Sequence, residues 1–292
     1  MVAQHRHHSL TDRYSGRRSV GARLTATAVL VATVLLVGCA GDQLGAPETR
    51  SASTSEVEHD GPRGDEALVA AAEFIADRYE QIDAASLSIA DYLFRNWGVQ
   101  ELSGARAAAL QRLAGSEVDR EERQLARLVD PAASSPDPTA EGTERTTAVL
   151  AAALYCDSNP WSTSDSDALA QLVAGGGYDT THAGLAVGWL AERECAAPTI
   201  EAVRAQVIEA VATELAQAPE VTDLAVEQSA ILIYLGAPGR VGPGWSEQVA
   251  AAQRSDGGWG PTASNWHMTL LAIWTIEGLS AAGAGVDMTS TT

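Results

Sequence analysis

The sequence contains no lysine, so its nineteen basic residues are all arginine, against thirty-eight aspartates and glutamates. The resulting formal charge of −19 excludes the basic face that a protein needs to bind a nucleic-acid backbone. We therefore expect no nucleic-acid partner. With 292 residues, of which 46% are hydrophobic, the chain is long enough to bury the core of one large domain or two small ones.

A second absence is that of alternating apolar and polar residues, the pattern of a half-buried strand. Apolar residues instead recur at helical spacing and are separated by turns rich in Gly, Pro, Ser and Asp. The pattern predicts an all-α chain with helices at 65–80, 84–96, 100–114, 117–128, 144–155, 165–174, 180–194, 200–217, 221–235, 245–253 and 265–279. A linker-like run at 130–139 divides N-terminal helical hairpins, 65–129, from the helices of 140–280.

The N-terminal apolar run is shorter than the roughly 20 residues of a typical membrane span. It reads LTATAVLVATVLLVG at residues 24–38 and follows five arginines, as in a signal peptide. Leu36-Val37-Gly38-Cys39 resembles the lipobox of bacterial lipoproteins, which implies that residues 1–38 are removed and that Cys39 carries lipid. The alternative is a short transmembrane anchor that ends in Cys by chance. Either interpretation exports the remainder and tethers it to a membrane.

Residues 39–64 are rich in Gly, Ser, Thr, Pro and charged residues, which is typical of a flexible tether behind the lipid. We thus expect the protein on the extracytoplasmic side of the cell membrane or the outer membrane, with the membrane as a partner through its lipid. Of the three cysteines, Cys156 and Cys195 then remain in an oxidising compartment. We predict a disulfide between them, with thiolate metal ligation as the alternative.

Two segments of the chain, 171–189 and 253–274, share one order of residues: Gln, a Gly cluster, an aromatic, a turn and then His-x-x-Leu-x-x-x-Trp. At these spacings the last part of each segment lines one face of a helix. Weaker copies carry tyrosine in place of the tryptophan, so that four aromatics recur about every 40 residues: Tyr155, Trp189, Tyr234 and Trp274. Helical hairpins of this size must stack beside one another to bury their apolar faces.

The stretch Gln253-Arg254-Ser255-Asp256-Gly257-Gly258-Trp259 resembles the Q-x-x-x-G-x-W signature of the terpenoid cyclase and protein prenyltransferase superfamily. A looser copy starts at Gln171 with Tyr178 in place of Trp. The resemblance implies an α/α toroid, complete or incomplete, in which one ring of helices lies inside another. It also implies a structural motif, in which Gln ends an outer helix, Gly permits a tight turn and Trp packs that turn against its neighbour.

Enzymes of this superfamily carry further motifs that the sequence lacks. These are the D-x-D-D acid motif, the D-D-x-x-D magnesium motif, the prenyltransferase zinc set of Asp, Cys and His, and the thioester of complement-type domains. Asp165 and Asp167 do not replace them. Catalysis therefore stays open, and we expect no cofactor.

Polar residues fall at the starts of the helices that the repeat would place inside the toroid. Parallel inner helices share one rim, where we expect His182 and His267. Asp179 lies three residues before His182 and could cap the helix or orient the imidazole. Three further residues are expected to border the same mouth: Tyr178, Asn265 and Trp266.

This rim has three interpretations. The simplest is structural, with Asp179 and Asn265 as N-caps and the two histidines in polar positions of the repeat. The second is a ligand pocket with a polar floor, in which Trp161, Trp259 and Trp266 act as stacking surfaces. The third is an open site for a divalent metal with three ligands: His182, His267 and Asp179.

Two functions follow from this pattern. The first is a lipoprotein without catalytic activity that binds a small molecule, a glycan or an envelope protein. The second is an enzyme that uses the rim, either a carbohydrate-active lyase or hydrolase or an enzyme of prenyl substrates, with candidate catalytic residues His182, His267 and Asp179. A lyase needs a cation to neutralise an acidic sugar, and arginine is sparse in the repeat region.

Overall fold

The computed structural model describes residues 64–115, 118, 120–134 and 144–283. All of them belong to one compact unit, which lies within Val57–Thr292. The predicted signal peptide, Cys39 and the tether up to residue 63 lie outside the described residues. None of the helices in the described ranges is long and apolar enough to cross a membrane.

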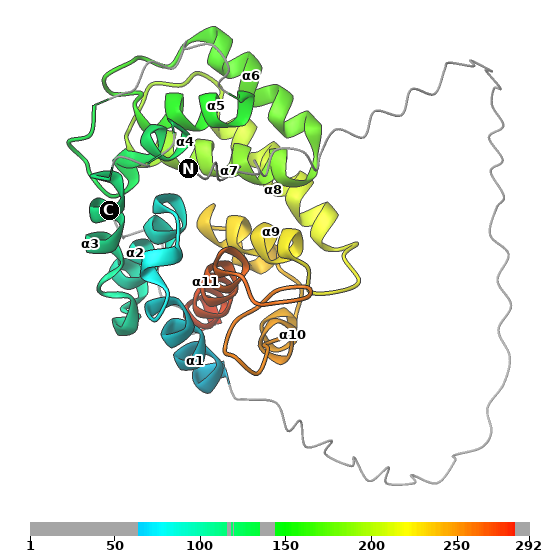
Figure 1. The fold of residues 1–292 in the computed structure, drawn as a ribbon. Helices are drawn as coiled ribbons and strands as arrows, with labels where there is room; N and C mark the ends of the chain where they lie inside the picture. Colours follow the sequence, from blue (N-terminus) through cyan, green and yellow to red (C-terminus); the bar gives the residue numbers. More distant parts are fainter. Residues whose placement is uncertain (1–63, 116–117, 119, 135–143, 284–292) are drawn as a thin grey trace, which may run out of the picture. The chain divides into compact units, whose positions relative to one another are not determined.

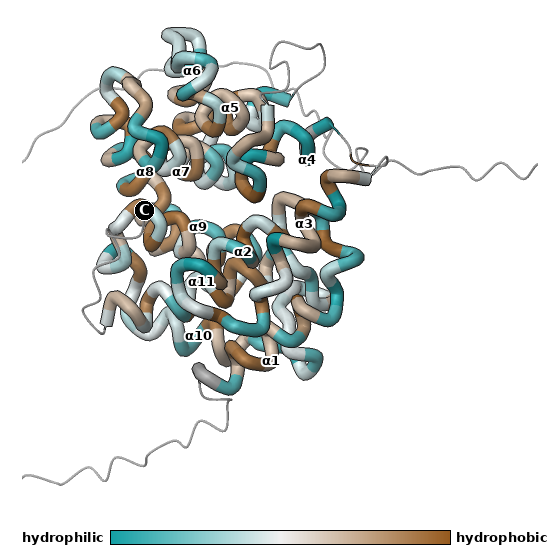
Figure 2. Tube along the Cα trace, turned by 90° about the vertical axis from the view of Figure 1, so that its left-hand side faces the viewer, coloured by the Kyte–Doolittle hydropathy of each residue, from teal (hydrophilic) through white to brown (hydrophobic). Residues whose placement is uncertain are grey.

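The described residues form an all-α structure, as predicted, with eleven α-helices and no strand beyond one isolated bridge between Trp259 and Asn265 (Figure 1). The helices are α1 (Gly64–Ala76), α2 (Ala84–Trp97), α3 (Ala105–Leu113), α4 (Arg120–Gln124), α5 (Arg145–Leu154), α6 (Thr163–Gly175), α7 (Gly177–Glu192), α8 (Ile200–Leu215), α9 (Asp223–Tyr234), α10 (Trp245–Ala251) and α11 (Trp266–Gly283). Along most of them apolar and polar residues alternate in short blocks, which lets one face be buried (Figure 2).

The predicted helices differ from the observed ones mainly at their ends. In place of the one helix predicted at 117–128, the described residues of this range form the short helix α4 and a 3₁₀ turn at Ala126–Leu128. Helix α6 begins earlier than predicted because Ser162 and Asp165 form a capping box, in which each side chain accepts a hydrogen bond from the other's backbone N–H.

Five inner helices follow one another in space in the order α2, α11, α9, α7 and α5, each packed against the next. Helix α4 contacts α5, and the 3₁₀ turn at Ala126–Leu128 contacts both α4 and α2, so the series returns to its first member. The outer helices pack between or behind these: α6 against α5 and α7, α8 against α7 and α9, and α1 and α10 against α11 (Figure 1). The inner helices therefore have neighbours on several sides.

The turn after α10 has the structural role that its motif implies. The Gln253 amide donates to Gly257 O at 2.8 Å and to Ala67 O in α1 at 2.7 Å. Gly257 adopts φ +86° and passes so close to Ala70 O that a Cβ atom would lie 2.5 Å from it. Trp259 is fully buried and donates from its indole to Val249 O at 2.6 Å. These contacts hold the turn against α1, the first helix of the domain, and we call the turn Gln253–Trp259 the clip.

The looser copy of the motif does not form a second clip. Gln171 is exposed, and Tyr178 lies in the first turn of α7, 41% exposed, in contrast to the buried Trp259.

The predicted disulfide does form, between Cys156 and Cys195. It ties the segment after α5 to the segment after α7.

Candidate functional site

A cavity of about 590 Å³ lies between the inner helices, a size that suits a small organic ligand. Its walls come from α2, α5, α7, α9 and α11 and from the 3₁₀ turn at Ala126–Leu128. The middle of the wall is apolar and includes Ile89, Leu150, Leu185, Ile231 and Leu271. The polar residues are placed toward two ends, which the directions of the helices define.

Four inner helices begin at the same end of the cavity. The Trp266 indole at the start of α11 donates to Asp83 at the start of α2, at 3.2 Å. His267 contacts Asp223 at the start of α9, and Asp223 accepts a hydrogen bond from Tyr178 at the start of α7. We call the cavity-lining residues of this end the N-terminal rim: Asp83, His182, Glu227, Trp266 and His267.

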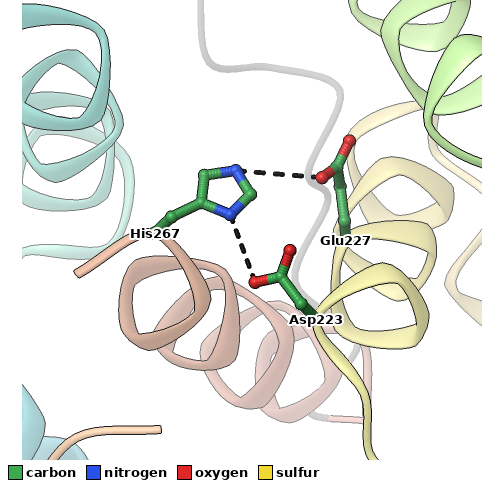
Figure 3. A group of neighbouring side chains, drawn as sticks. All are labelled: Asp223, Glu227 and His267. Carbon is green, nitrogen blue, oxygen red and sulfur yellow. Dashed lines mark hydrogen bonds and ion pairs between the residues drawn. The ribbon is translucent and has the colours of Figure 1, made fainter. Parts of the chain in front are cut away.

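One cluster joins α9 to α11 beside this rim (Figure 3). The two nitrogens of the His267 ring face two different carboxylates, with Nδ1 3.3 Å from Asp223 Oδ1 and Nε2 3.8 Å from Glu227 Oε2. Asp223 and Glu227 are one helical turn apart, so both carboxylates lie on the same face of α9. Within the described residues this is the set of His, Cys, Asp and Glu side chains close enough to hold a metal ion together.

Neighbouring side chains hold the two carboxylates of the cluster. The Tyr178 hydroxyl donates to Asp223 Oδ2 at 2.8 Å, and the Thr181 hydroxyl donates to Glu227 Oε1. Glu227 is only 4% exposed, so its carboxylate has a fixed place on the wall of the cavity. The cluster is therefore braced from α7 as well as from its own two helices.

The contact between His267 and Asp223 changes the pKa of both groups. Burial alone would lower the pKa of His267, but its hydrogen bond to Asp223 and the charges of Asp223, Glu227 and Asp83 raise it above 6.5. Burial would raise the pKa of Asp223, but the hydrogen bonds from His267 and Tyr178 and the charge of His267 bring it below 3.8. The imidazolium and the carboxylate thus stabilise each other.

We expect the free energy of unfolding contributed by this contact to be largest between the ordinary pKa of Asp, 3.8, and that of His, 6.5. The raised pKa of His267 contributes stability below 6.5, and this is lost as the pH rises through the folded-state value. The lowered pKa of Asp223 contributes stability above 3.8, and this is lost as the pH falls through the folded-state value.

Denaturant unfolding of the metal-free wild-type chain and of His267→Gln, at about pH 5.5 and about pH 9, measures this contribution. The difference between the two chains should shrink at the higher pH. His182→Gln is the control, because His182 Nδ1 lies 2.7 Å from the backbone oxygen of Tyr178 and not beside a carboxylate. A difference that is the same at both pH values would contradict the pairing.

The other end of the cavity is aromatic and rich in arginine. The Trp274 ring lies 4.6 Å from that of Tyr92 and 5.7 Å from that of Tyr234, whose hydroxyl donates to Glu192 at 2.7 Å. Burial, with the nearby charge of Glu192, raises the pKa of Tyr92 to about 12, so its hydroxyl stays neutral. We call this the C-terminal end, because it includes the last turns of α2, α7 and α9.

Arginines from separate elements line this part of the cavity. Arg95 is paired with Asp91 at 2.9 Å, and Arg127 forms a two-pronged contact with Asp157. Arg193 makes no side-chain hydrogen bond or ion pair with a described residue. Burial together with the charge of Arg127 lowers its pKa, and the charges of Asp157 and Glu192 offset part of this effect. The disulfide between Cys156 and Cys195 lies next to both Asp157 and Arg193 in the sequence, so it helps to fix this end.

No protein-family model, curated protein or solved structure matches the chain. The function must therefore be argued from the site itself and not from a relative. The resemblance to the terpenoid cyclase and prenyltransferase superfamily rests on the local motif, and a complete toroid of two rings stays a prediction.

The structure brings three of the residues predicted for the rim and its pocket to the cavity and leaves five outside its lining. His182, Trp266 and His267 line it, whereas the other five do not: Tyr178, Asp179, Trp161, Trp259 and Asn265. Asn265 accepts a hydrogen bond from Met268 N at 2.8 Å, as an N-cap does. The Trp161 indole donates to Ser166 at 2.9 Å, and the buried Trp259 belongs to the clip and offers no stacking surface.

Asp179 has neither of its two predicted roles. The residue at the N-cap of α7 is Gly176, and the Nδ1 atom of His182 faces a backbone oxygen. The Asp179 carboxylate is exposed and lies beside Gly175, at the end of the preceding helix. The metal-capable cluster therefore consists of His267, Asp223 and Glu227 and includes neither Asp179 nor His182.

Proposed function

We propose that this chain is an exported lipoprotein, anchored through Cys39, whose helical domain binds a small amphipathic molecule in the cavity between its inner helices. The observation that carries the proposal is the cavity itself, which is lined by inward faces of five helices from distant parts of the sequence. A hollow of about 590 Å³ with an apolar middle and polar groups at its ends has the size and character of a small-ligand site. This favours a small molecule over a glycan or an envelope protein.

The distribution of polar groups suggests the shape of the ligand. Its apolar body would lie against the aliphatic middle of the wall and the rings of Tyr92 and Trp274. An anionic group would lie at the C-terminal end, where the Arg193 guanidinium forms no hydrogen bond or ion pair with a described residue and feels the carboxylates of Asp157 and Glu192 only through their charge. A planar guanidinium suits a carboxylate, sulfonate or phosphate.

The same distribution gives less support to a lyase or hydrolase of acidic sugars at the rim. His267, which could act as a base, lies beside Asp223 and Glu227, whose charges would repel the carboxylate of such a sugar. Arg193 lies with the last turns of the helices, at the other end of the cavity. We therefore propose binding and not catalysis.

The fluorescent probe 1-anilinonaphthalene-8-sulfonate tests the pocket, because it combines an aromatic body with one sulfonate. We expect one probe molecule per wild-type chain and a loss of affinity of roughly tenfold or more, about 1.4 kcal/mol, in Leu185→Trp and in Arg193→Gln. Leu185 lines the cavity and is only partly buried, so its replacement fills the cavity without overpacking the core. Leu185→Met conserves volume and serves as the control.

Unchanged probe affinity in Leu185→Trp would refute the proposed pocket.

The lipid anchor is tested separately in an exporting bacterium fed with labelled palmitate. The wild-type chain should carry the label and fractionate with membranes, and Cys39→Ala should do neither. A labelled Cys39→Ala chain would contradict the anchor and leave the pocket unaffected.

A further inference from the structure

The cluster at the start of α9 and α11 has no part in the proposed binding of an amphipathic ligand, whose anionic group would lie at the C-terminal end. We propose that Asp223, Glu227 and His267 bind one divalent cation at the N-terminal rim, with a zinc-like preference and an open coordination position toward the cavity. This proposal is independent of the ligand at the other end and does not depend on the lipid anchor.

The positions of the donor atoms suit such an ion. In a tetrahedral zinc site with bonds of about 2.0–2.2 Å, neighbouring donors lie roughly 3.3 Å apart. One ligand atom from each of the three residues lies within 4.8 Å of the others, and His267 Nδ1 is 3.3 Å from Asp223 Oδ1. In this arrangement different nitrogens of His267 face the two carboxylates, and a rotation of the His267 side chain, which is 42% exposed, would bring one nitrogen toward an ion held by both.

The state of Glu227 is a second, independent reason to place a cation here. The residue is 96% buried, and one of its oxygens accepts a hydrogen bond from Thr181. The other, Oε2, accepts no hydrogen bond from a described residue, and the closest facing donor atom, His267 Nε2, is 3.8 Å away. A negative charge on a largely buried side chain is costly unless donors or a cation reach it, and the oxygen of Glu227 that faces the cavity has no close donor among the described residues.

The charges and the surroundings also fit a divalent ion. Two carboxylates with a neutral imidazole carry a charge of −2, which one divalent cation neutralises. Tyr178 and Thr181 hold the outer oxygens, as hydrogen-bonded neighbours do at metal sites. His267 and Glu227 line the cavity, so a position not taken by protein would face it. The mixture of one nitrogen and two oxygens favours Zn²⁺ over Mg²⁺ or Ca²⁺.

The experiment is a calorimetric titration of the untagged full chain with ZnCl₂, and with MgCl₂ for comparison, together with the visible spectrum of the Co²⁺-loaded chain. His5, His7, His8 and Cys39 are replaced by alanine in every sample, because they could bind zinc elsewhere in the chain. We expect one Zn²⁺ per chain, weaker binding of Mg²⁺, and Co²⁺ absorption bands typical of low coordination number.

Three variants test the donors one at a time. Glu227→Gln and Asp223→Asn keep the shape of the side chain, and His267→Ala removes a partly exposed ring, so all three should fold. Each is expected to weaken Zn²⁺ binding by roughly tenfold or more. His182→Ala is the matched control, since His182 lines the same rim outside the cluster and should leave the affinity unchanged.

Far-UV circular dichroism confirms that each variant is folded before it is titrated. The proposal is overturned if the chain shows no site of one-to-one stoichiometry. It is also overturned if a one-to-one site survives in all three cluster variants, because the ion is then bound elsewhere. Loss of the site in His182→Ala would contradict the assignment of the donors.

Discussion

Replacing both Cys156 and Cys195 by alanine is expected to lower the free energy of unfolding by about 4 kcal/mol. The two cysteines are 39 positions apart, and their bond closes a loop that contains α6 and α7. Without the bond the unfolded chain gains the conformational freedom of that loop, which is the main source of the effect. Since whole domains are stable by only about 5–15 kcal/mol, the loss would be a large fraction of the total.

Denaturant unfolding under non-reducing conditions measures this loss. Cys39→Ala is the matched control, because it removes a cysteine that lies outside the disulfide, and it should leave the unfolding midpoint where it is. Arg193 lies two residues before Cys195, so we also expect the double variant to bind the sulfonate probe more weakly. A loss of stability below about 1 kcal/mol would mean that the loop is held by packing alone.

Replacing Gly257 by alanine is expected to cost about 3 kcal/mol or more, for two reasons that add. The residue has φ +86°, a left-handed conformation that costs an L-residue roughly 1–2 kcal/mol. Its missing Cβ would also lie 2.5 Å from the backbone oxygen of Ala70, and a backbone atom cannot move aside as a side chain can. Overpacking of this kind costs roughly 1–3 kcal/mol.

Two other glycines separate these contributions. Gly244 has φ +75° with no atom near the position of its Cβ, so Gly244→Ala should show the conformational cost alone, about 1–2 kcal/mol. Gly242 has neither constraint, and Gly242→Ala should change the free energy of unfolding by close to zero. Thermal or denaturant unfolding of the three variants should give this order. Equal losses of unfolding free energy in Gly257→Ala and Gly244→Ala would show that the close approach of Ala70 in α1 adds nothing to the cost of the substitution at Gly257.

The sequence was sufficient to predict most of the helices, because their apolar residues recur at a helical period over long stretches. The prediction was less accurate where a side-chain hydrogen bond determines where a helix begins. At Ser162, a capping box starts α6 before the first apolar residue of that helix. The sequence also did not show that the two copies of the turn motif take different structures. Trp259 is buried beside α10 and α11, where its indole donates to Val249 O and its backbone N–H donates to Thr269, whereas Tyr178 lies in the first turn of α7 and is 41% exposed.

The candidate site was predicted in part. His267 was expected at the rim, but its partners were not, because the register of α9 against α11 depends on tertiary packing. One signal for Glu227 was available in the repeat. His182 and His267 each stand seven residues before an aromatic of the repeat, and Glu227 stands seven residues before Tyr234. The pattern would have placed Glu227 on the same inward face.

The common starting end of α2, α7, α9 and α11 has an electrostatic consequence for the acidic rim. Each helix carries a macrodipole with a partial charge of about +0.5 at its N-terminus. Four such ends beside Asp83, Asp223 and Glu227 offset much of the negative potential that these carboxylates would otherwise create. The rim therefore attracts cations only weakly from a distance, and selectivity there would come from direct coordination and not from long-range attraction.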